Sequence, residues 1–321
     1  MPFPTNAHRY FGSHLIVPED LSASDISAIF AISQDLQTAF EAGHREVLFP
    51  GRVLGLVFEK PSLRTRVSFE AAMVHLGGAS LFLGEDTGFS SSRESIADFG
   101  RVLSQYVDAI VCRVKNHESL VQLAAAAAVP VINGLSDYCH PCQALADIYT
   151  LKQHVGSVAG LKFAFVGDGN NVARSLAVLC GLLGMRFALA APKAYQFDSA
   201  FCAHLKTILP AADVMETTDP VVAVEGAAVV YTDVWTSMGQ EQERAKRIAA
   251  LQPFQVNESL LKHCPDALFM HCLPARRGEE VTDGVIDGPQ SVVVQEAANR
   301  MHLQKGLLAW MLGPTRPLDA R

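Results

Sequence analysis

The chain has 321 residues, 49% of them hydrophobic, which is enough for large cores and predicts two domains. Its 26 basic and 33 acidic residues are well mixed and give a net charge of −7, a balance that is not typical of nucleic-acid or anionic-membrane binding. No apolar run approaches the ~20 residues of a transmembrane helix and residues 1–6 lack the features of a secretion signal, so we expect a cytoplasmic protein.

Short apolar runs alternate with segments of helical periodicity along the chain. The runs that predict strands are residues 53–58, 80–83, 109–114 and 129–132, then 162–166, 186–190, 229–232 and 267–270. The helices expected between them include residues 67–76, 95–106, 118–128, 144–154 and 240–251. This alternation predicts an α/β protein of two doubly wound domains, each with a central parallel sheet flanked by helices.

The domain boundary is expected near residues 138–160, where one helix leads from the first sheet to the second. A last helix over residues 299–312 needs a surface to cover, because its apolar residues recur at helical spacing. The seven cysteines are odd in number and lie mostly in apolar segments, which predicts reduced, buried thiols.

A polar segment, Ser62-Leu63-Arg64-Thr65-Arg66, separates the strand at residues 53–58 from the helix at residues 67–76. A helix start offers unpaired N–H groups and the positive end of the helix dipole, and Ser62 is a good N-cap. Arg64 adds a planar fork of donors that matches phosphate oxygens. The segment therefore predicts an anion site, although two arginines at a helix start also fit a solvated or salt-bridged face.

Three further polar segments each close a hydrophobic run. They are His140-Pro141-Cys142-Gln143, the segment Asp233-Val234-Trp235-Thr236-Ser237-Met238-Gly239, and His271-Cys272-Leu273-Pro274. In this order and spacing, the four segments resemble those of the aspartate/ornithine carbamoyltransferase family. The Ser237-Met238-Gly239 part of the segment 233–239, together with His271-Cys272-Leu273-Pro274, resembles the ornithine branch in particular. The resemblance extends from about Phe49 to the last helix.

The resemblance implies transfer of a carbamoyl group from carbamoyl phosphate to the side-chain amine of L-ornithine, giving L-citrulline and phosphate in arginine biosynthesis. It implies a carbamoyl phosphate-binding domain of residues 1–140, completed by residues 299–321, and an ornithine-binding domain of residues 141–298. The active site would lie in the cleft between the domains. No metal or organic cofactor is implied, and the expected assembly is a homotrimer or a multiple of it, without nucleic-acid or membrane partners.

The resemblance also implies the site residues. Those implied to bind carbamoyl phosphate are Ser62, Leu63, Arg64, Thr65, Arg113, His140, Gln143, Cys272, Leu273 and Arg300. The catalytic residues among them are Arg113, His140, Cys272 and Arg300, and the residues implied to bind ornithine are Asn171, Asp233, Ser237 and Met238. Arg113 ends the strand at residues 109–114, and His140 follows the strand that ends near Leu135. Ligands bind at the ends of parallel strands.

Individual roles follow from the same resemblance. The first segment holds the phosphate, partly through the Leu63 N–H, while Arg113 and His140 contact the carbonyl oxygen. Gln143 holds the carbamoyl NH2, and Asp233 pairs with the α-ammonium group of ornithine. Cys272 is expected to position polar groups beside Asp233 and not to act as a nucleophile, and Arg300 is expected to open the last helix and stabilise the reacting phosphate.

Two positions depart from the family pattern. Leu63 stands where the family usually has threonine, so only a backbone contact survives there. The loop at residues 85–93 offers no clear match to the polar group with which the family reaches a neighbouring subunit. Arg66 cannot share a helix face with Arg64, two residues away, and is interpreted as structural.

Other interpretations of single motifs remain open at this point. Cys139 and Cys142 form a C-x-x-C spacing, which fits a redox or zinc site, but no second ligand pair matches it. The glycine-rich segment at residues 167–171 fits a dinucleotide site only weakly, because Val172 stands at the third glycine position. His140 and Asp233 could each cap a turn, Gln143 could be an ordinary first-turn residue, Cys272 a buried inert thiol and Arg300 a surface arginine.

Two alternatives to the implied activity remain. The chain could be a carbamoyltransferase for another amine acceptor, such as aspartate, putrescine or acetylated ornithine. It could also be a catalytically silent binding or regulatory subunit with the same fold. The segment 233–239 disfavours the first alternative, and the joint presence of Arg64, Arg113, His140 and Cys272 disfavours the second.

Overall fold

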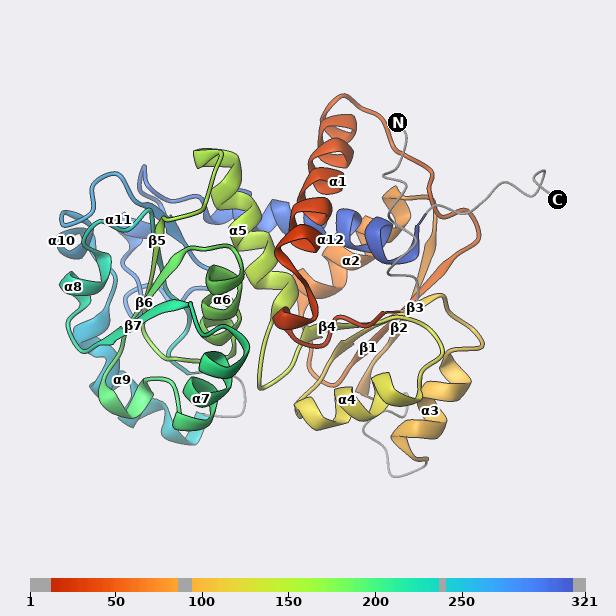
Figure 1. Cartoon of the computed structure of the whole chain (residues 1–321), viewed down its shortest axis with the longest axis horizontal. Helices are drawn as coiled ribbons and strands as arrows, with labels where there is room; N and C mark the ends of the chain where they lie inside the picture. Colours follow the sequence, from red (N-terminus) through yellow and green to blue (C-terminus); the bar gives the residue numbers. More distant parts are fainter. Residues whose placement is uncertain (1–12, 86–93, 237–240, 314–321) are drawn as a thin grey trace. The chain divides into compact units, whose positions relative to one another are not determined.

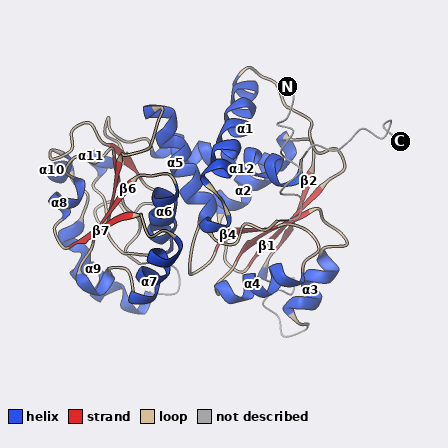
Figure 2. Cartoon of the chain, in the orientation of Figure 1, coloured by secondary structure: helices blue, strands red, loops and turns tan. Residues whose placement is uncertain are grey.

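A computed structural model describes residues 13–85, 94–236 and 241–313. The chain divides into two compact units, the first comprising Met1–Cys142 with Arg300–Arg321 and the second Gln143–Asn299. Helices α5 (Pro141–Val155) and α12 (Val293–Leu312) each begin in one unit and end in the other. Each unit has its own sheet, enclosed by helices as Figure 2 shows.

The sheet of the first unit has the strand order β2-β1-β3-β4, and all of its neighbouring strands are parallel. Its strands are β1 (Val53–Phe58), β2 (Ala79–Leu83), β3 (Ala109–Arg113) and β4 (Val131–Leu135). Helices α3 (Ile96–Leu103) and α4 (His117–Ala126) cover one face, and α1 (Ala23–Glu41) and α2 (Leu63–His75) lie on the other (Figure 1). Apolar side chains of α3 and α4 form a core with β1 and β3.

The sheet of the second unit has the order β7-β6-β5-β8-β9, again with all pairs parallel. Its strands are β5 (Lys162–Val166), β6 (Arg186–Ala190), β7 (Asp213–Thr217), β8 (Val229–Tyr231) and β9 (Leu268–Met270). Its further helices are α6 (Asn171–Leu182), α7 (Ser199–Ile208), α8 (Pro220–Val224), α9 (Arg244–Leu251), α10 (Glu258–Leu261) and α11 (Asp283–Ile286). Helices α8, α10 and α11 pack on one face of the sheet, while α6 and α7 lie on the other (Figure 1).

The predicted class, two doubly wound α/β units with parallel sheets, is confirmed. Within it, strand β7 was not predicted from the sequence. It is an edge strand with no fully buried residue, so it lacks the apolar run that marks an inner strand. Helix α1 was also not predicted, although its Ser22 N-cap forms a capping box with Asp25.

Strand β4 ends at Leu135, as expected for the strand before His140, and Gly134 lets it approach β3: a Cβ at this position would lie 3.0 Å from the Cys112 carbonyl oxygen. The predicted start of the last helix was wrong. Helix α12 begins at Val293, so Arg300 lies inside the helix and does not open it. The residues just before Arg300 include Ala297 and Ala298, which are strong helix formers and extend the helix toward its N-terminus. Among the described residues, no helix is long and apolar enough to cross a membrane.

Candidate functional site

In each sheet the strand order reverses at one point, and in such sheets ligands bind beyond the strand ends at that reversal. In the first unit the reversal lies between β1 and β3. Ser62 follows β1, and Arg113 is the last residue of β3. In the second unit it lies between β5 and β8, which are followed by the segment 167–171 and Asp233. The predicted site residues of each unit therefore gather at its reversal point.

Ser62 is the N-cap of α2, as the sequence predicted, and its hydroxyl accepts the Thr65 N–H at 3.3 Å. The hydroxyl also donates to Thr65 Oγ1 at 3.1 Å. Leu63 and Arg64 occupy the first turn of α2, where Arg64 is half-buried and the Leu63 side chain is 74% exposed. The backbone N–H groups of this turn point toward the helix N-terminus, where an anion would be stabilised.

Three buried basic side chains gather close to this helix start. Arg113, His140 and Arg300 come from β3, the residue before α5, and α12, and each is less than 10% exposed. Arg300 donates to Thr65 Oγ1 at 2.9 Å, which joins the cluster to the first turn of α2. Burial, and then the charges of Arg300 and Arg113, hold the pKa of His140 well below its usual 6.5, so its imidazole is neutral at neutral pH.

The cluster of the first unit is suited to a doubly charged anion with a polar carbonyl. The arginines keep their charge under all physiological conditions. A neutral imidazole adds a directed hydrogen bond without a further charge. The structure thus brings together Thr65, Arg113, His140 and Arg300, with Ser62 as the cap that orders the turn.

The interpretation of Arg66 as structural agrees with its surroundings. Its guanidinium forms a 3.1 Å ion pair with Glu70 and stacks over the Phe82 ring at 3.7 Å. The Cys139 and Cys142 thiols are also engaged, because they donate to the Ile16 and Asn133 carbonyl oxygens at 3.4 Å. Burial raises the pKa of Cys142 to about 12, so this thiol is protonated and unsuited to redox or zinc chemistry.

In the second unit, Asp233 lies two residues after β8 and is 8% exposed. Its carboxylate accepts Asn170 Nδ2 at 2.8 Å, the Cys272 thiol at 3.1 Å and the Val234 N–H at 2.8 Å. Thr232 donates to the Val166 carbonyl at 2.6 Å, which fixes the end of β8 beside β5. Asp233 does cap its own turn, but two side chains from other segments also orient it.

Asn170, which sequence reasoning did not select, is the N-cap of α6 and accepts the Val172 and Ala173 N–H groups. These two amides are therefore occupied, and a pyrophosphate would find them satisfied, which argues against a dinucleotide site. Asn171, the residue that was selected, follows as the first residue of α6 and is half-buried. A sequence signal for Asn170 did exist, because asparagine directly before a helix start favours capping.

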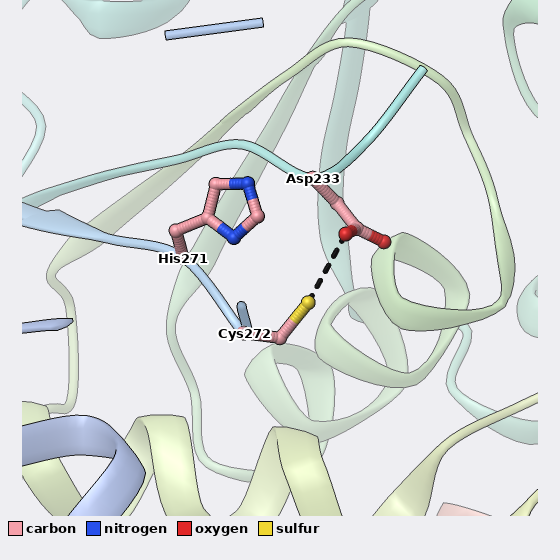
Figure 3. A group of neighbouring side chains, drawn as sticks. All are labelled: Asp233, His271 and Cys272. Carbon is pink, nitrogen blue, oxygen red and sulfur yellow. Dashed lines mark hydrogen bonds between the residues drawn. The ribbon is translucent and has the colours of Figure 1, made fainter. Parts of the chain in front are cut away.

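Cys272 lies with Asp233 and His271 in the one group of described residues whose spacing would fit a metal ion (Figure 3). Both nitrogens of His271 are engaged, however: Nδ1 accepts the Leu273 N–H at 2.9 Å and Nε2 contacts Glu280 at 3.1 Å. Burial, and then the charge of Asp233, raises the pKa of Cys272 well above its usual value. The thiol is thus a hydrogen-bond donor, unfavourable both as a metal ligand and as a nucleophile.

Leu273 follows with a left-handed backbone, at φ 55, and a cis peptide bond to Pro274. The Leu273 N–H is held by His271 Nδ1, so this backbone conformation is fixed from within the segment. The left-handed region is unfavourable for a leucine by roughly 1–2 kcal/mol. Such a conformation is typical of functional segments that the surrounding structure holds in place.

A buried arginine, Arg247 of α9, was not selected from the sequence either. It forms an ion pair with Asp168 and donates Nε to the Trp235 carbonyl oxygen. Burial raises the pKa of Asp168, and the charge of Arg247 opposes that rise. Arg247 thereby joins the segment after β5 to the segment after Asp233. A single arginine in a predicted helix gives no sequence signal for such a role.

The predicted ornithine contacts Ser237 and Met238, and residues 86–93 of the predicted intersubunit loop, lie outside the described residues. Gln143 is described: it lies in the first turn of α5, is 1% exposed and donates to two carboxylates, those of Asp147 and Glu296. Gln143 is thus a first-turn residue of α5, and its side chain is buried and hydrogen-bonded.

Comparisons with known proteins agree with this arrangement. Residues 13–153 match the family described as "Aspartate/ornithine carbamoyltransferase, carbamoyl-P binding domain", and residues 159–311 match the "Asp/Orn binding domain" of the same family. Ornithine carbamoyltransferase of Bacillus subtilis is 47% identical over 94% of this chain and 94% of its own. The chain belongs to the aspartate/ornithine carbamoyltransferase family.

Solved structures of the family share its fold. A structure of ornithine carbamoyltransferase from Pyrococcus furiosus matches with a TM-score of 0.91 and 47% identity, covering 95% of this chain and 99% of the other. The enzyme from Thermus thermophilus matches with a TM-score of 0.84 and 41% identity, covering 94% and 99%. The anabolic enzyme of Pyrococcus furiosus is 48% identical over 94% of this chain and 97% of its own.

Proposed function

We propose that the protein is an ornithine carbamoyltransferase that forms L-citrulline and phosphate from carbamoyl phosphate and L-ornithine, in the direction of arginine biosynthesis. The observation that carries the proposal is the cluster of Arg113, His140 and Arg300 joined to Thr65 at the start of α2. Such a cluster combines fixed positive charge with a neutral hydrogen-bonding group, as an acyl phosphate requires.

In this proposal the phosphate is held at the start of α2 by Ser62, Arg64, Thr65 and the Leu63 N–H. The exposure of the Leu63 side chain supports a contact through its backbone alone. Arg113 and His140 contact the carbonyl oxygen, and Gln143, Cys272 and Leu273 surround the carbamoyl group. Arg300 stabilises the charge that grows on the leaving phosphate.

Ornithine is held in the second unit. Asp233 pairs with the α-ammonium group, because it is a buried carboxylate that Asn170 and Cys272 hold in one orientation. Asn171, Ser237 and Met238 complete the contacts to the amino-acid end of ornithine. The preference of the enzyme for ornithine over aspartate and putrescine follows from the pairing of Asp233 with the α-ammonium group. Aspartate places this group differently, and putrescine lacks it.

The chemical step is a nucleophilic attack by the side-chain amine on the carbamoyl carbon. A C–N bond forms, the C–O bond to phosphate breaks, and the amine proton leaves with the phosphate. With a pKa of ~10.4, as for lysine, the neutral amine costs about 4–5 kcal/mol at neutral pH. Positive groups fixed in advance around the carbonyl and phosphate oxygens lower the barrier without a metal or an organic cofactor.

The proposed domains follow the predicted bounds: residues 1–140 with 299–321 bind carbamoyl phosphate, and residues 141–298 bind ornithine. We further propose a cytoplasmic homotrimer or a multiple of it. Exposed apolar side chains on the edge strand β2 and on α2 support association, among them Leu81 at 49%, Val67 at 50% and Val74 at 59%. Light scattering of the purified protein tests the assembly.

A citrulline assay on the purified protein tests the activity directly. Ornithine, aspartate, putrescine and N-acetylornithine are compared as acceptors at equal carbamoyl phosphate concentration. We expect citrulline from ornithine and at most slow transfer to the other amines. Transfer that favours another amine would assign a different acceptor, and binding of carbamoyl phosphate without transfer to any amine would indicate a silent subunit.

A further inference from the structure

Both N–H groups of the Gln143 side-chain amide are hydrogen-bonded to carboxyl groups. Nε2 donates to Asp147 Oδ1 at 2.8 Å and to Glu296 Oε1 at 3.3 Å. A primary amide nitrogen carries two N–H donors, and ionised carboxylates only accept. The two acids therefore hold the amide in one of its two orientations, with the nitrogen toward them. The opposite orientation would bring the amide oxygen against two carboxyl oxygens that are themselves acceptors.

In this orientation the side-chain carbonyl oxygen of Gln143, Oε1, points away from Asp147 and Glu296. The side chain is 1% exposed, and within the described part of the chain Oε1 has no hydrogen-bond partner. Leaving a buried acceptor unsatisfied costs about 1–3 kcal/mol, so native proteins rarely do so without a reason. An acceptor held in this way is ready for a donor supplied by a ligand.

The two acids are themselves held in place. Glu296 Oε2 accepts the His271 N–H at 2.9 Å, and Glu296 Oε1 accepts the Tyr231 hydroxyl at 3.5 Å. Asp147 lies one helical turn after Gln143 in α5 and is fully buried. Contacts from a helix, a strand end and the segment before Cys272 thus converge on one amide. Such a network is rigid enough to control its orientation.

We propose that Asp147 and Glu296 are positioning residues that orient Gln143 so that Oε1 accepts the carbamoyl NH2 of the substrate. This inference rests on the proposed function. It assigns to the pair the selection of carbamoyl phosphate over other acyl phosphates. An NH2 group donates a hydrogen bond to the buried Gln143 Oε1. A methyl group in its place leaves Oε1 without a hydrogen bond, and a carboxylate oxygen in its place is repelled by Oε1.

Three stable phosphonates isolate this contact. Phosphonoacetamide carries an NH2 group, 2-oxopropylphosphonate a methyl group and phosphonoacetate a carboxylate oxygen at the same position. Calorimetry gives the dissociation constant of each with the purified protein. We expect phosphonoacetamide to bind at least about tenfold more tightly than the methyl compound, which corresponds to about 1.4 kcal/mol.

The variants Asp147→Asn, Glu296→Gln and their combination keep the shape of both acids but add a donor, so that the Gln143 amide can turn over. The preference for the amide ligand should fall stepwise, toward equal binding of the amide and methyl compounds in the double variant. Gln143→Leu should abolish the preference outright. In steady-state assays the KM for carbamoyl phosphate should rise while the KM for ornithine changes less.

Thr150→Val is the matched control. Thr150 lies in the same helix, is fully buried and accepts Asn299 Nδ2 at 2.9 Å, so its loss lowers stability without a contact to Gln143. We expect this variant to keep the ligand preference of the unmodified protein. If it loses the preference to the same degree as Asp147→Asn, the acids act through stability alone and the proposal is overturned.

Two further outcomes overturn the proposal. One is equal binding of the amide and methyl phosphonates by the unmodified protein, which needs no variant to fold. The other is an unchanged preference in the double variant when Gln143→Leu loses it. Citrulline formation by the unmodified protein separates these outcomes from failure of the proposed function: without citrulline both proposals fail, and with citrulline only the orienting role does.

Discussion

The Cys272 thiol donates a hydrogen bond to Oδ1 of Asp233 at 3.1 Å (Figure 3). Asn170 occupies the other carboxylate oxygen, Oδ2, at 2.8 Å. The cysteine therefore acts as a protonated donor that fixes an acid, because burial and that same acid raise the pKa of Cys272 well above its usual value. The hydrogen bond from this thiol helps to hold the Asp233 carboxylate in one orientation.

Replacement of Cys272 tests this role. Cys272→Ser retains a hydroxyl donor and should keep turnover within a few fold, whereas Cys272→Ala removes the donor. The loss should raise the KM for ornithine by roughly fivefold, or about 1 kcal/mol. Cys264→Ala, at a buried cysteine of the same unit, is the control and should leave the KM unchanged. Equal effects of alanine and serine at position 272 would contradict a donor role.

Asp233→Ala should lower kcat/KM with ornithine steeply, because the α-ammonium group loses its counter-charge in a buried setting. Carbamoyl phosphate binding should persist. Putrescine has no α-ammonium or carboxylate at that centre, so its already low kcat/KM should fall far less. Steady-state assays with both amines on both proteins give the comparison. Equal proportional losses would show that Asp233 serves the fold or the chemistry in general.

Arg64→Ala should weaken carbamoyl phosphate binding by about 1.5–3 kcal/mol, because it removes a charge-assisted hydrogen-bonding fork. Calorimetry without ornithine measures this change. Arg66→Ala is the matched control, since Arg66 lies in the same turn but pairs with Glu70 and stacks on Phe82. The site assignment of Arg64 is withdrawn if its variant folds and binds with unchanged affinity.

Leu63→Thr restores the residue usual in the family. The Leu63 side chain is 74% exposed and the backbone N–H is kept, so affinity for carbamoyl phosphate and turnover should stay within a few fold. Calorimetry and the citrulline assay measure both. A change beyond about a hundredfold, roughly 2.7 kcal/mol, would mean that the leucine side chain shapes the pocket.

Acid stability should depend on His302, which packs its ring against Phe40 at 5.2 Å. Burial, and then the charge of Lys305, lowers the pKa of His302 from 6.5 to about 4. The unfolded chain therefore binds a proton at this residue between these values while the folded chain does not. Its contribution to stability is complete above pH 6.5 and is lost as the pH falls toward 4.

His302→Gln should accordingly lose less unfolding free energy between pH 6.5 and 4 than the unmodified protein does. Urea unfolding at a series of pH values measures the difference. His204→Gln, which changes a histidine whose environment is more exposed, is the control and should follow the unmodified protein. Parallel curves for His302→Gln and the unmodified protein would show that His302 is not held neutral.

Sequence by itself determined the α/β class, the strands that precede the candidate site residues and the helix start at Ser62. These follow from local pattern: buried strands are apolar runs, and Ser62 marks a helix start wherever the chain places it. The sequence failed at β7, whose half-exposed edge position leaves no apolar run, and at the start of α12. Local propensity does not report which face of an element the fold will cover.

Only the tertiary structure decided which polar residues meet. Asn170 and Asp233 are 63 positions apart, and Gln143 and Glu296 are 153 apart, yet each pair is joined by a hydrogen bond. The same folding sets the pKa of His140 and Cys272, because burial and neighbouring charges act through space and not along the chain. The sequence contains the residue types of the site, but their protonation states and orientations arise from packing.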